Sequence, residues 1–339
     1  FYVASQFQAA GTAISTSLTV DTTVAIISGA AIVVVYVFLG GFWAASVTDA
    51  LQGLMMLFVA VILPVVALVA VGGPAGLSAG LQALEDPSLM RLVDQPGLLL
   101  SMVFVAGLFG IGLGYPGQPH VVNRFMALRS KSEVRFARTI ALAWAAVIYV
   151  GMVVLGWAGR VLMPELADAE SVLLELSVDQ LPPVLGGLVA GGVLAAIMST
   201  SDSQLLVAGS AVSHDLRRGR VSLMIDRVVI VLLGVAAVAL ALWFPDSIFD
   251  RVLFAWQALG NAFGPLLVVI LFYGSVRPGY RLAAMLVGFA LTVVISFFPQ
   301  APGNALERLL PLFVALGIAL AGRGASAGNR PRRQAGRQN

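Results

Sequence analysis

The stretch GIGLGYPGQPH, residues 110–120, lies in the middle of a long apolar segment, residues 98–128. It holds four glycines and two prolines. As one α-helix, the 31 residues of the segment would measure about 46 Å at 1.5 Å per residue, although a bilayer core is only about 30 Å thick. Pro116 and Pro119 lack an N–H and clash with the preceding helical turn. The stretch therefore predicts a helix that is broken, or at least kinked, near its centre.

The composition around this stretch indicates a polytopic membrane protein. The chain is 59% hydrophobic and 11% charged, with a mean hydropathy of +0.95, whereas soluble domains average about 25% charged residues. A spanning helix needs roughly 20 mostly apolar residues. Apolar runs predict about ten spanning segments, at residues 1–18, 22–41, 46–72, 98–128, 134–160, 184–213, 222–244, 250–274, 279–298 and 308–323.

The distribution of basic residues tests this count. If residue 1 is placed on the cytoplasmic side, the loops and the tail on that side receive sixteen of the 20 basic residues. This bias fits an even number of spans with both ends of the chain in the cytoplasm. We expect residues 1–323 to form one transmembrane domain and residues 324–339 to form a basic, disordered cytoplasmic tail, and we prefer this tail to a nucleic-acid-binding arm.

Few classes of soluble chemistry fit the sequence. The chain has no cysteine and two histidines, which excludes disulfides and thiol chemistry and argues against a histidine-based metal site. It has no nucleophile–base pair and no phosphate-binding loop, so an enzyme is not expected. The chain begins with Phe1 inside an apolar run, and we interpret it as a fragment of a longer protein.

A second stretch, AAIMSTSDSQLLVAGS at residues 195–210, places six consecutive polar residues in an apolar segment. On a helix, Ala196, Ser199 and Thr200 share one face. Asp202 and Ser203 follow one turn later. Hydroxyl, carbonyl and carboxylate oxygens suit a small hard cation such as Na⁺. Alternatively, the hydroxyls bond to the helix backbone and Asp202 is hydrated near the cytoplasmic end.

Four stretches together resemble the sodium–solute symporter family, and within it the sodium/proline symporters. These are AAIMSTSDSQLLVAGSAVSHDL, GLGYPGQPHVVNRFMA, YVFLGGFWAASVTDALQGLMM and FAWQALGNAFGPLL. The resemblance covers the chain in order to about residue 323. It implies an all-α, leucine-transporter-like fold with two inverted repeats and discontinuous helices. It also implies that the first three spanning helices precede this chain and that the fragment alone does not transport.

The resemblance assigns cation-binding roles by position. It gives the principal Na⁺ site the Ala196 carbonyl and the Ser199 and Thr200 hydroxyls, with the remaining ligands on a preceding helix. It also suggests a second Na⁺ site formed by Asp49, Asp202 and Ser203. Considered alone, Asp49 could instead be a carboxylate at the N-terminus of a helix.

The resemblance also implies an aromatic-lined substrate site. Tyr2, Tyr115 and Pro119 match its positions, whereas the tryptophan expected at residue 111 is Ile111 here. Gln6 and Gln257 are further candidates, although they could simply bond between helices. The predicted function is Na⁺-coupled symport of a small organic solute, most of all L-proline, across a bacterial cytoplasmic membrane. The alternatives are another amino acid or small carboxylate, or a membrane sensor module.

Overall fold

The computed structural model describes all residues except 85–90, 92, 213–222, 244–246, 299–300 and 325–339. Nine helices in the described part are long and apolar enough to cross a membrane. These nine spans correspond to nine of the ten predicted segments. The remaining predicted segment, residues 1–18, corresponds to α1 (Tyr2–Leu18), which has 17 residues and is shorter than the other nine. Apart from Gly324, the predicted tail at 324–339 lies outside the described residues.

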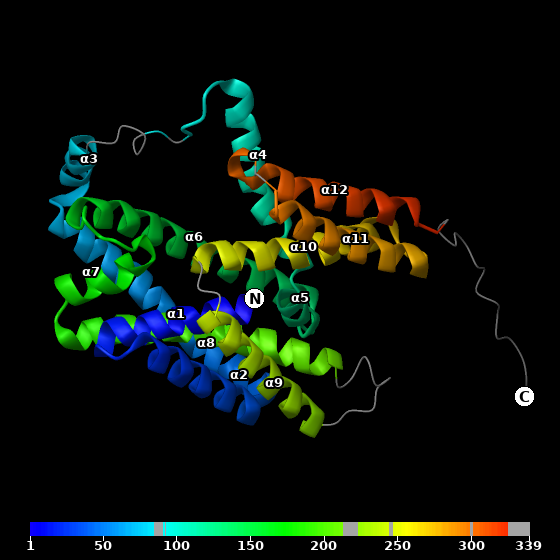
Figure 1. The fold of residues 1–339 in the computed structure, drawn as a ribbon, viewed down its shortest axis with the longest axis horizontal. Helices are drawn as coiled ribbons and strands as arrows, with labels where there is room; N and C mark the ends of the chain where they lie inside the picture. The colour runs from blue at the N-terminus through cyan, green and yellow to red at the C-terminus, as the bar shows by residue number, and fades with distance from the viewer. Residues whose placement is uncertain (85–90, 92, 213–222, 244–246, 299–300, 325–339) are drawn as a thin grey trace, which may run out of the picture. The chain divides into compact units, whose positions relative to one another are not determined.

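The chain forms two compact units, which we call the larger unit and the smaller unit. The larger unit comprises Phe1–Leu92 and Arg124–Val252, and the smaller unit comprises Val93–Asn123 and Leu253–Asn339. Within the larger unit, α1 packs against α2, α8 and α9 (Figure 1). The helices of this unit besides α1 are α2 (Thr22–Ala70), α3 (Gly73–Ala83), α6 (Lys131–Leu162), α7 (Val172–Gln180), α8 (Pro183–Ser210) and α9 (Leu223–Trp243).

Helix α2 consists of two spans that meet at a sharp break. Gly41 has φ 66° and ψ −178°, a backbone conformation that essentially only glycine adopts. The spans on either side are Thr22–Trp43 and Ala45–Ala70, close to the predicted 22–41 and 46–72. Asp21 caps the first span by accepting hydrogen bonds from the Thr23 and Val24 N–H groups at 2.9 and 3.2 Å, which satisfies two of the backbone donors left over at a helix start.

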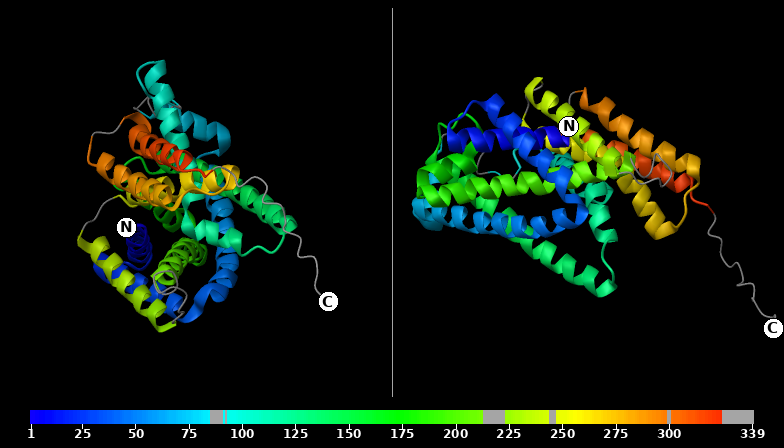
Figure 2. Two further views of the ribbon diagram at one scale, coloured as in Figure 1. Left: turned by 90° about the vertical axis from the view of Figure 1, so that its right-hand side faces the viewer. Right: turned by 90° about the horizontal axis from the view of Figure 1, so that it is seen from below.

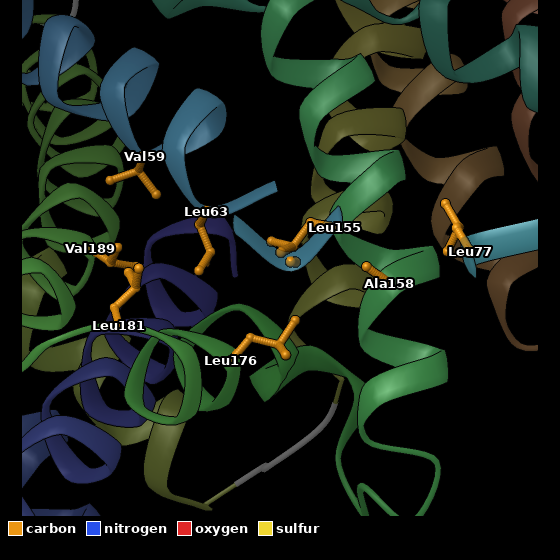
Figure 3. Packing of buried hydrophobic residues seen from close by; sticks show 9 residues of the cluster. Val59, Leu63, Leu77, Leu155, Ala158, Leu176, Leu181 and Val189 are labelled. Atoms are coloured by element: carbon orange, nitrogen blue, oxygen red, sulfur yellow. The ribbon is translucent and has the colours of Figure 1, made fainter. Parts of the chain in front are cut away.

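The main core cluster of the larger unit joins the second span of α2 to α3, α6, α7 and α8. Figure 3 shows Val59 and Leu63 of α2 beside Val189 of α8, with Leu155 of α6 and Leu176 of α7 completing the cluster. Leu63 and Leu176 are fully buried. Small residues bring α8 close to α2: a Cβ atom on Gly192 would lie 2.5 Å from Val59 Cγ2. This packing fixes the face of α8 that carries the polar run.

The smaller unit contains the broken segment and the last helices. Its elements are α4 (Leu98–Leu113), the 3₁₀ turn Tyr115–Gly117, part of α5 (Pro119–Met126), most of α10 (Ile248–Tyr273), α11 (Pro278–Ser296) and α12 (Ala305–Ala321). Helices α11 and α12 run side by side (Figure 2). Val269, Val276, Ala284 and Ala319 form a buried cluster between the last helices.

The predicted break in segment 98–128 is confirmed. Helix α4 ends at Leu113, the chain passes through the 3₁₀ turn, and α5 begins at Pro119. The break packs tightly on α10, because a Cβ atom on Gly117 would lie 2.6 Å from the Gly260 carbonyl oxygen and 2.6 Å from the Gly264 nitrogen. The glycines at the break thus permit a close backbone approach that no larger residue allows.

Candidate functional site

The first polar cluster, which we call the principal cluster, lies on one face of α8. Ser199 Oγ donates to the Ala196 carbonyl oxygen at 3.1 Å, and Thr200 Oγ1 donates to the same oxygen at 3.0 Å. This is the backbone bonding that the alternative interpretation expects. The same geometry gathers three hard oxygens within about one helical turn. All three residues are half-buried, so the set suits a small cation approaching from the side of the helix.

The second polar cluster joins three helices. Asp49 lies on α2, Asp202 and Ser203 lie on α8, and Arg124 lies on α5. One guanidinium nitrogen of Arg124 (Nη2) donates to both Asp49 Oδ2 and Ser203 Oγ. Ser203 Oγ also lies 2.8 Å from the Ser199 carbonyl oxygen and 3.0 Å from Asp202 Oδ1; its single hydrogen can serve only one of them at a time.

The carboxylates of the second cluster are more confined than the sequence alone indicated. Asp202 is fully buried, so the alternative that it is hydrated at a helix end is wrong. The Asp49 side chain is 10% exposed and bonds to Arg124. It lies close to the start of the second α2 span, Ala45–Ala70, a position that also agrees with the alternative of a carboxylate near a helix N-terminus. Asp49 Oδ1 and Asp202 Oδ2 are buried and have no hydrogen-bond partner among the described residues.

The donor set of the second cluster fits a cation. Buried oxygens without a partner are costly, and two carboxylates with one guanidinium carry a net charge of −1 when all three are ionised. A monovalent cation held by Asp49 and Asp202 would offset that charge. Arg124 is the residue that the sequence analysis missed. Its partner Asp49 lies 75 positions away in the chain, so no local pattern links the two.

Four predicted substrate residues lie in the smaller unit, around the break. Tyr115 is 48% exposed, Ile111 and Pro119 are half-buried, and Gln257 is almost completely buried. Gln257 Nε2 donates to the Gly110 carbonyl at 3.4 Å, as the inter-helix alternative expects. Its Oε1 atom is buried and has no partner in the described part of the chain, so Gln257 retains an acceptor for a ligand.

Side chains satisfy the backbone carbonyls at the break. Trp256 Nε1 donates to the Ile111 carbonyl at 3.0 Å. Gln118 Nε2 donates to the Gly114 carbonyl at 3.2 Å and the Trp256 carbonyl at 2.8 Å. The ring of Trp256 also lies against Tyr115, with a centroid distance of 5.7 Å. Non-helical backbone at membrane depth requires such partners, and Trp256 supplies an aromatic ring beside the residue where a tryptophan was expected.

The remaining predicted substrate residues, Tyr2 and Gln6, lie in the larger unit on α1. They are separated by four positions and therefore share one face of the helix. Both are half-buried. The Tyr2 carbonyl accepts a hydrogen bond from Ser5 Oγ at 2.7 Å, so Ser5 is tied to its own helix while Tyr2 and Gln6 occupy the neighbouring face.

The match to known families agrees with this arrangement of broken helix and oxygen-rich face. A family model described as "Sodium:solute symporter family" matches residues 1–288. The chain belongs to the sodium:solute symporter family. It is 32% identical over 303 residues to the sodium/proline symporter of Escherichia coli (strain K12), covering 85% of this chain and 59% of the relative. It is 31% identical over 337 residues to the high-affinity proline transporter PutP of Bacillus subtilis (strain 168), covering 93% and 70%.

Family membership confirms that the protein is a multi-pass membrane protein and that transport, not enzymatic catalysis, is the activity of its relatives. The chain spans about three fifths of the length of the first of these relatives. A solved structure of a Na⁺-coupled sialic acid symporter matches with a TM-score of 0.68 at 19% identity, covering 94% of this chain and 72% of that one. The fold is therefore the predicted leucine-transporter-like fold.

Proposed function

We propose that the full-length protein is a Na⁺-coupled symporter for a small organic solute, with L-proline as the first candidate. Here the full-length protein means the longest natural chain that contains these residues. The observation that carries the proposal is the principal cluster of Ala196, Ser199 and Thr200 oxygens in a chain of a sodium symporter family. Proline is favoured because two relatives at 31–32% identity are named proline transporters.

The proposed mechanism is alternating access. Na⁺ binds the α8 oxygens, and the solute binds near the break between α4 and α5, where Tyr115 and Trp256 offer aromatic surface and Gln257 offers an acceptor. Stacking of a small apolar ring against Tyr or Trp suits a proline side chain. Each ligand stabilises the same outward-facing arrangement, so the Na⁺ gradient drives solute uptake.

Uptake by the purified full-length protein in proteoliposomes tests this proposal. We expect L-proline to accumulate above its external concentration when an inward Na⁺ gradient is imposed, and accumulation to stop when K⁺ replaces Na⁺. A competition panel of amino acids and small carboxylates identifies the preferred solute. Saturable binding without accumulation would favour the sensor alternative, and uptake that is equal in Na⁺ and K⁺ would contradict sodium coupling.

We further propose that the protein lies in a bacterial cytoplasmic membrane with both ends of this chain on the cytoplasmic side. The positive-inside bias supports this orientation. This chain has no cysteine, so a single cysteine introduced into it reports topology once any cysteine elsewhere in the full-length protein is replaced by serine. Ser132, in the first turn of α6, and Ala167, beyond the end of α6, are both exposed. We expect Ser132→Cys to be protected from a membrane-impermeant thiol reagent in intact cells and Ala167→Cys to be labelled; the reverse pattern would invert the topology.

A further inference from the structure

A buried arginine lies outside both polar clusters and has no role in the sodium sites. Arg251, in the first turn of α10, is only 8% exposed. Its Nη1 atom donates to Gln8 Oε1 on α1 at 2.9 Å. Arg251 therefore lies beside α1, the helix that carries the predicted substrate residues Tyr2 and Gln6.

The charge of Arg251 is not balanced within the described residues. Asp250 is exposed, and adjacent residues on a helix do not face each other. The carboxylate of Glu170 is engaged by the start of α10, where it accepts from Ser247 Oγ and from the Ile248 and Phe249 N–H groups at 2.8–3.0 Å. In the part of the chain that the structure describes, no carboxylate bonds to Arg251.

This position is unfavourable for a cation on two grounds. A buried charge without a counter-ion is strongly penalised. A positive side chain in the first turn of a helix is also repelled by the positive end of the helix dipole. Gln8 is neutral and accepts only one hydrogen bond from a group that has five donors. An anion beside Arg251 relieves both penalties, and the fork of the guanidinium matches a carboxylate in two-point geometry.

We propose that Arg251 and Gln8 form a carboxylate-binding subsite, and that the transported solute presents its carboxylate to this subsite. The inference rests on the proposed transport function and adds the recognised group: a carboxylate. Arg251 supplies the charge and two of the donors, and Gln8 holds the guanidinium in position from α1.

Competition between an acid and its carboxamide tests the subsite. The experiment measures uptake of the preferred solute in proteoliposomes of the full-length protein and determines the inhibition constants of L-proline and L-prolinamide. If another acid is preferred, that acid and its carboxamide replace them. We expect the wild-type protein to bind the acid more tightly. Arg251→Gln should lower the ratio of the two inhibition constants roughly 10- to 100-fold, the range expected for losing a charge-assisted bond.

Two further variants separate recognition from folding. Gln8→Glu places a built-in carboxylate next to Arg251, so it should weaken inhibition by the acid about tenfold or more and weaken inhibition by the uncharged carboxamide much less. Arg160→Gln removes an exposed arginine at the end of α6 and should leave the ratio within about twofold of the wild type, as is usual for surface substitutions.

The outcomes distinguish this inference from the proposed function. If the wild-type protein accumulates no solute under a Na⁺ gradient, the proposed function and the subsite fall together. If the wild-type protein does accumulate solute, but Arg251→Gln and Gln8→Glu show the same ratio of acid to carboxamide inhibition constants as the wild type, only the proposed subsite is overturned. Because the ratio is measured within each variant, a lower yield of folded protein does not alter it.

Discussion

The two polar clusters on α8 differ in the charge of their side chains. The principal cluster contains only neutral oxygens, and all of them come from one helix. The second cluster gathers two carboxylates and a guanidinium from α2, α5 and α8. The principal cluster contains no positively charged side chain of its own, so a bound cation meets no competitor there. In the second cluster, Arg124 already occupies part of the carboxylate and hydroxyl oxygens. We therefore expect sodium dependence to rest mainly on the principal cluster.

The largest effect should come from removing both hydroxyls of the principal cluster. Ser199→Ala with Thr200→Ala deletes two of its three oxygens, and each is worth about 1 kcal/mol or more. We expect the Na⁺ concentration for half-maximal uptake by the full-length protein to rise about 30-fold or more. The control is Ser210→Ala, which removes an exposed hydroxyl at the end of the same helix. An unchanged Na⁺ requirement in the double variant would remove the principal cluster from the mechanism.

An intermediate effect is expected at the ion pair of the second cluster. Asp49→Asn leaves Arg124 without its counter-charge, and Arg124→Gln leaves Asp49 without its donor. Because the two groups are in contact, the losses should not add. We expect the double variant to be more stable to thermal unfolding than the sum of the single losses predicts, by about 1–2 kcal/mol.

The same cycle has a matched control on the surface. Asp179 is exposed at the end of α7, and Asp179→Asn should change the stability by less than about 0.5 kcal/mol. Strict additivity of the Asp49 and Arg124 losses would mean that the pair contributes nothing in the membrane-embedded protein.

The smallest effect should distinguish two buried neighbours on α8. Ser201 Oγ has no hydrogen-bond partner among the described residues, so Ser201→Ala should change the unfolding temperature by no more than about 2 °C.

Asp202→Asn removes a carboxylate of the second cluster. We expect it to lower the Hill coefficient for Na⁺ toward 1 if that cluster binds a second ion. An unaltered coefficient above 1 would place the second ion elsewhere.

The sequence predicted the features that depend on neighbouring residues. The break near residue 114 follows from glycines and prolines that cannot continue a helix, and the shared face of Ala196, Ser199 and Thr200 follows from helical spacing. Contacts between distant segments were out of reach. The bond from Trp256 to the Ile111 carbonyl joins residues 145 positions apart. The contact of Arg251 with Gln8 of α1 joins residues 243 positions apart, and the sequence analysis gave Arg251 no role.

The break in α2 at Gly41 has a consequence for how the protein enters the membrane. The two spans that meet there are joined by a few apolar residues, and the first basic residue of the chain is Arg91. Lys and Arg near the ends of spans set the orientation of a helix during insertion, and the first 90 residues contain neither. The α2 spans should therefore enter the bilayer together as a hairpin whose direction is dictated by other parts of the polypeptide, such as the basic loop before α6.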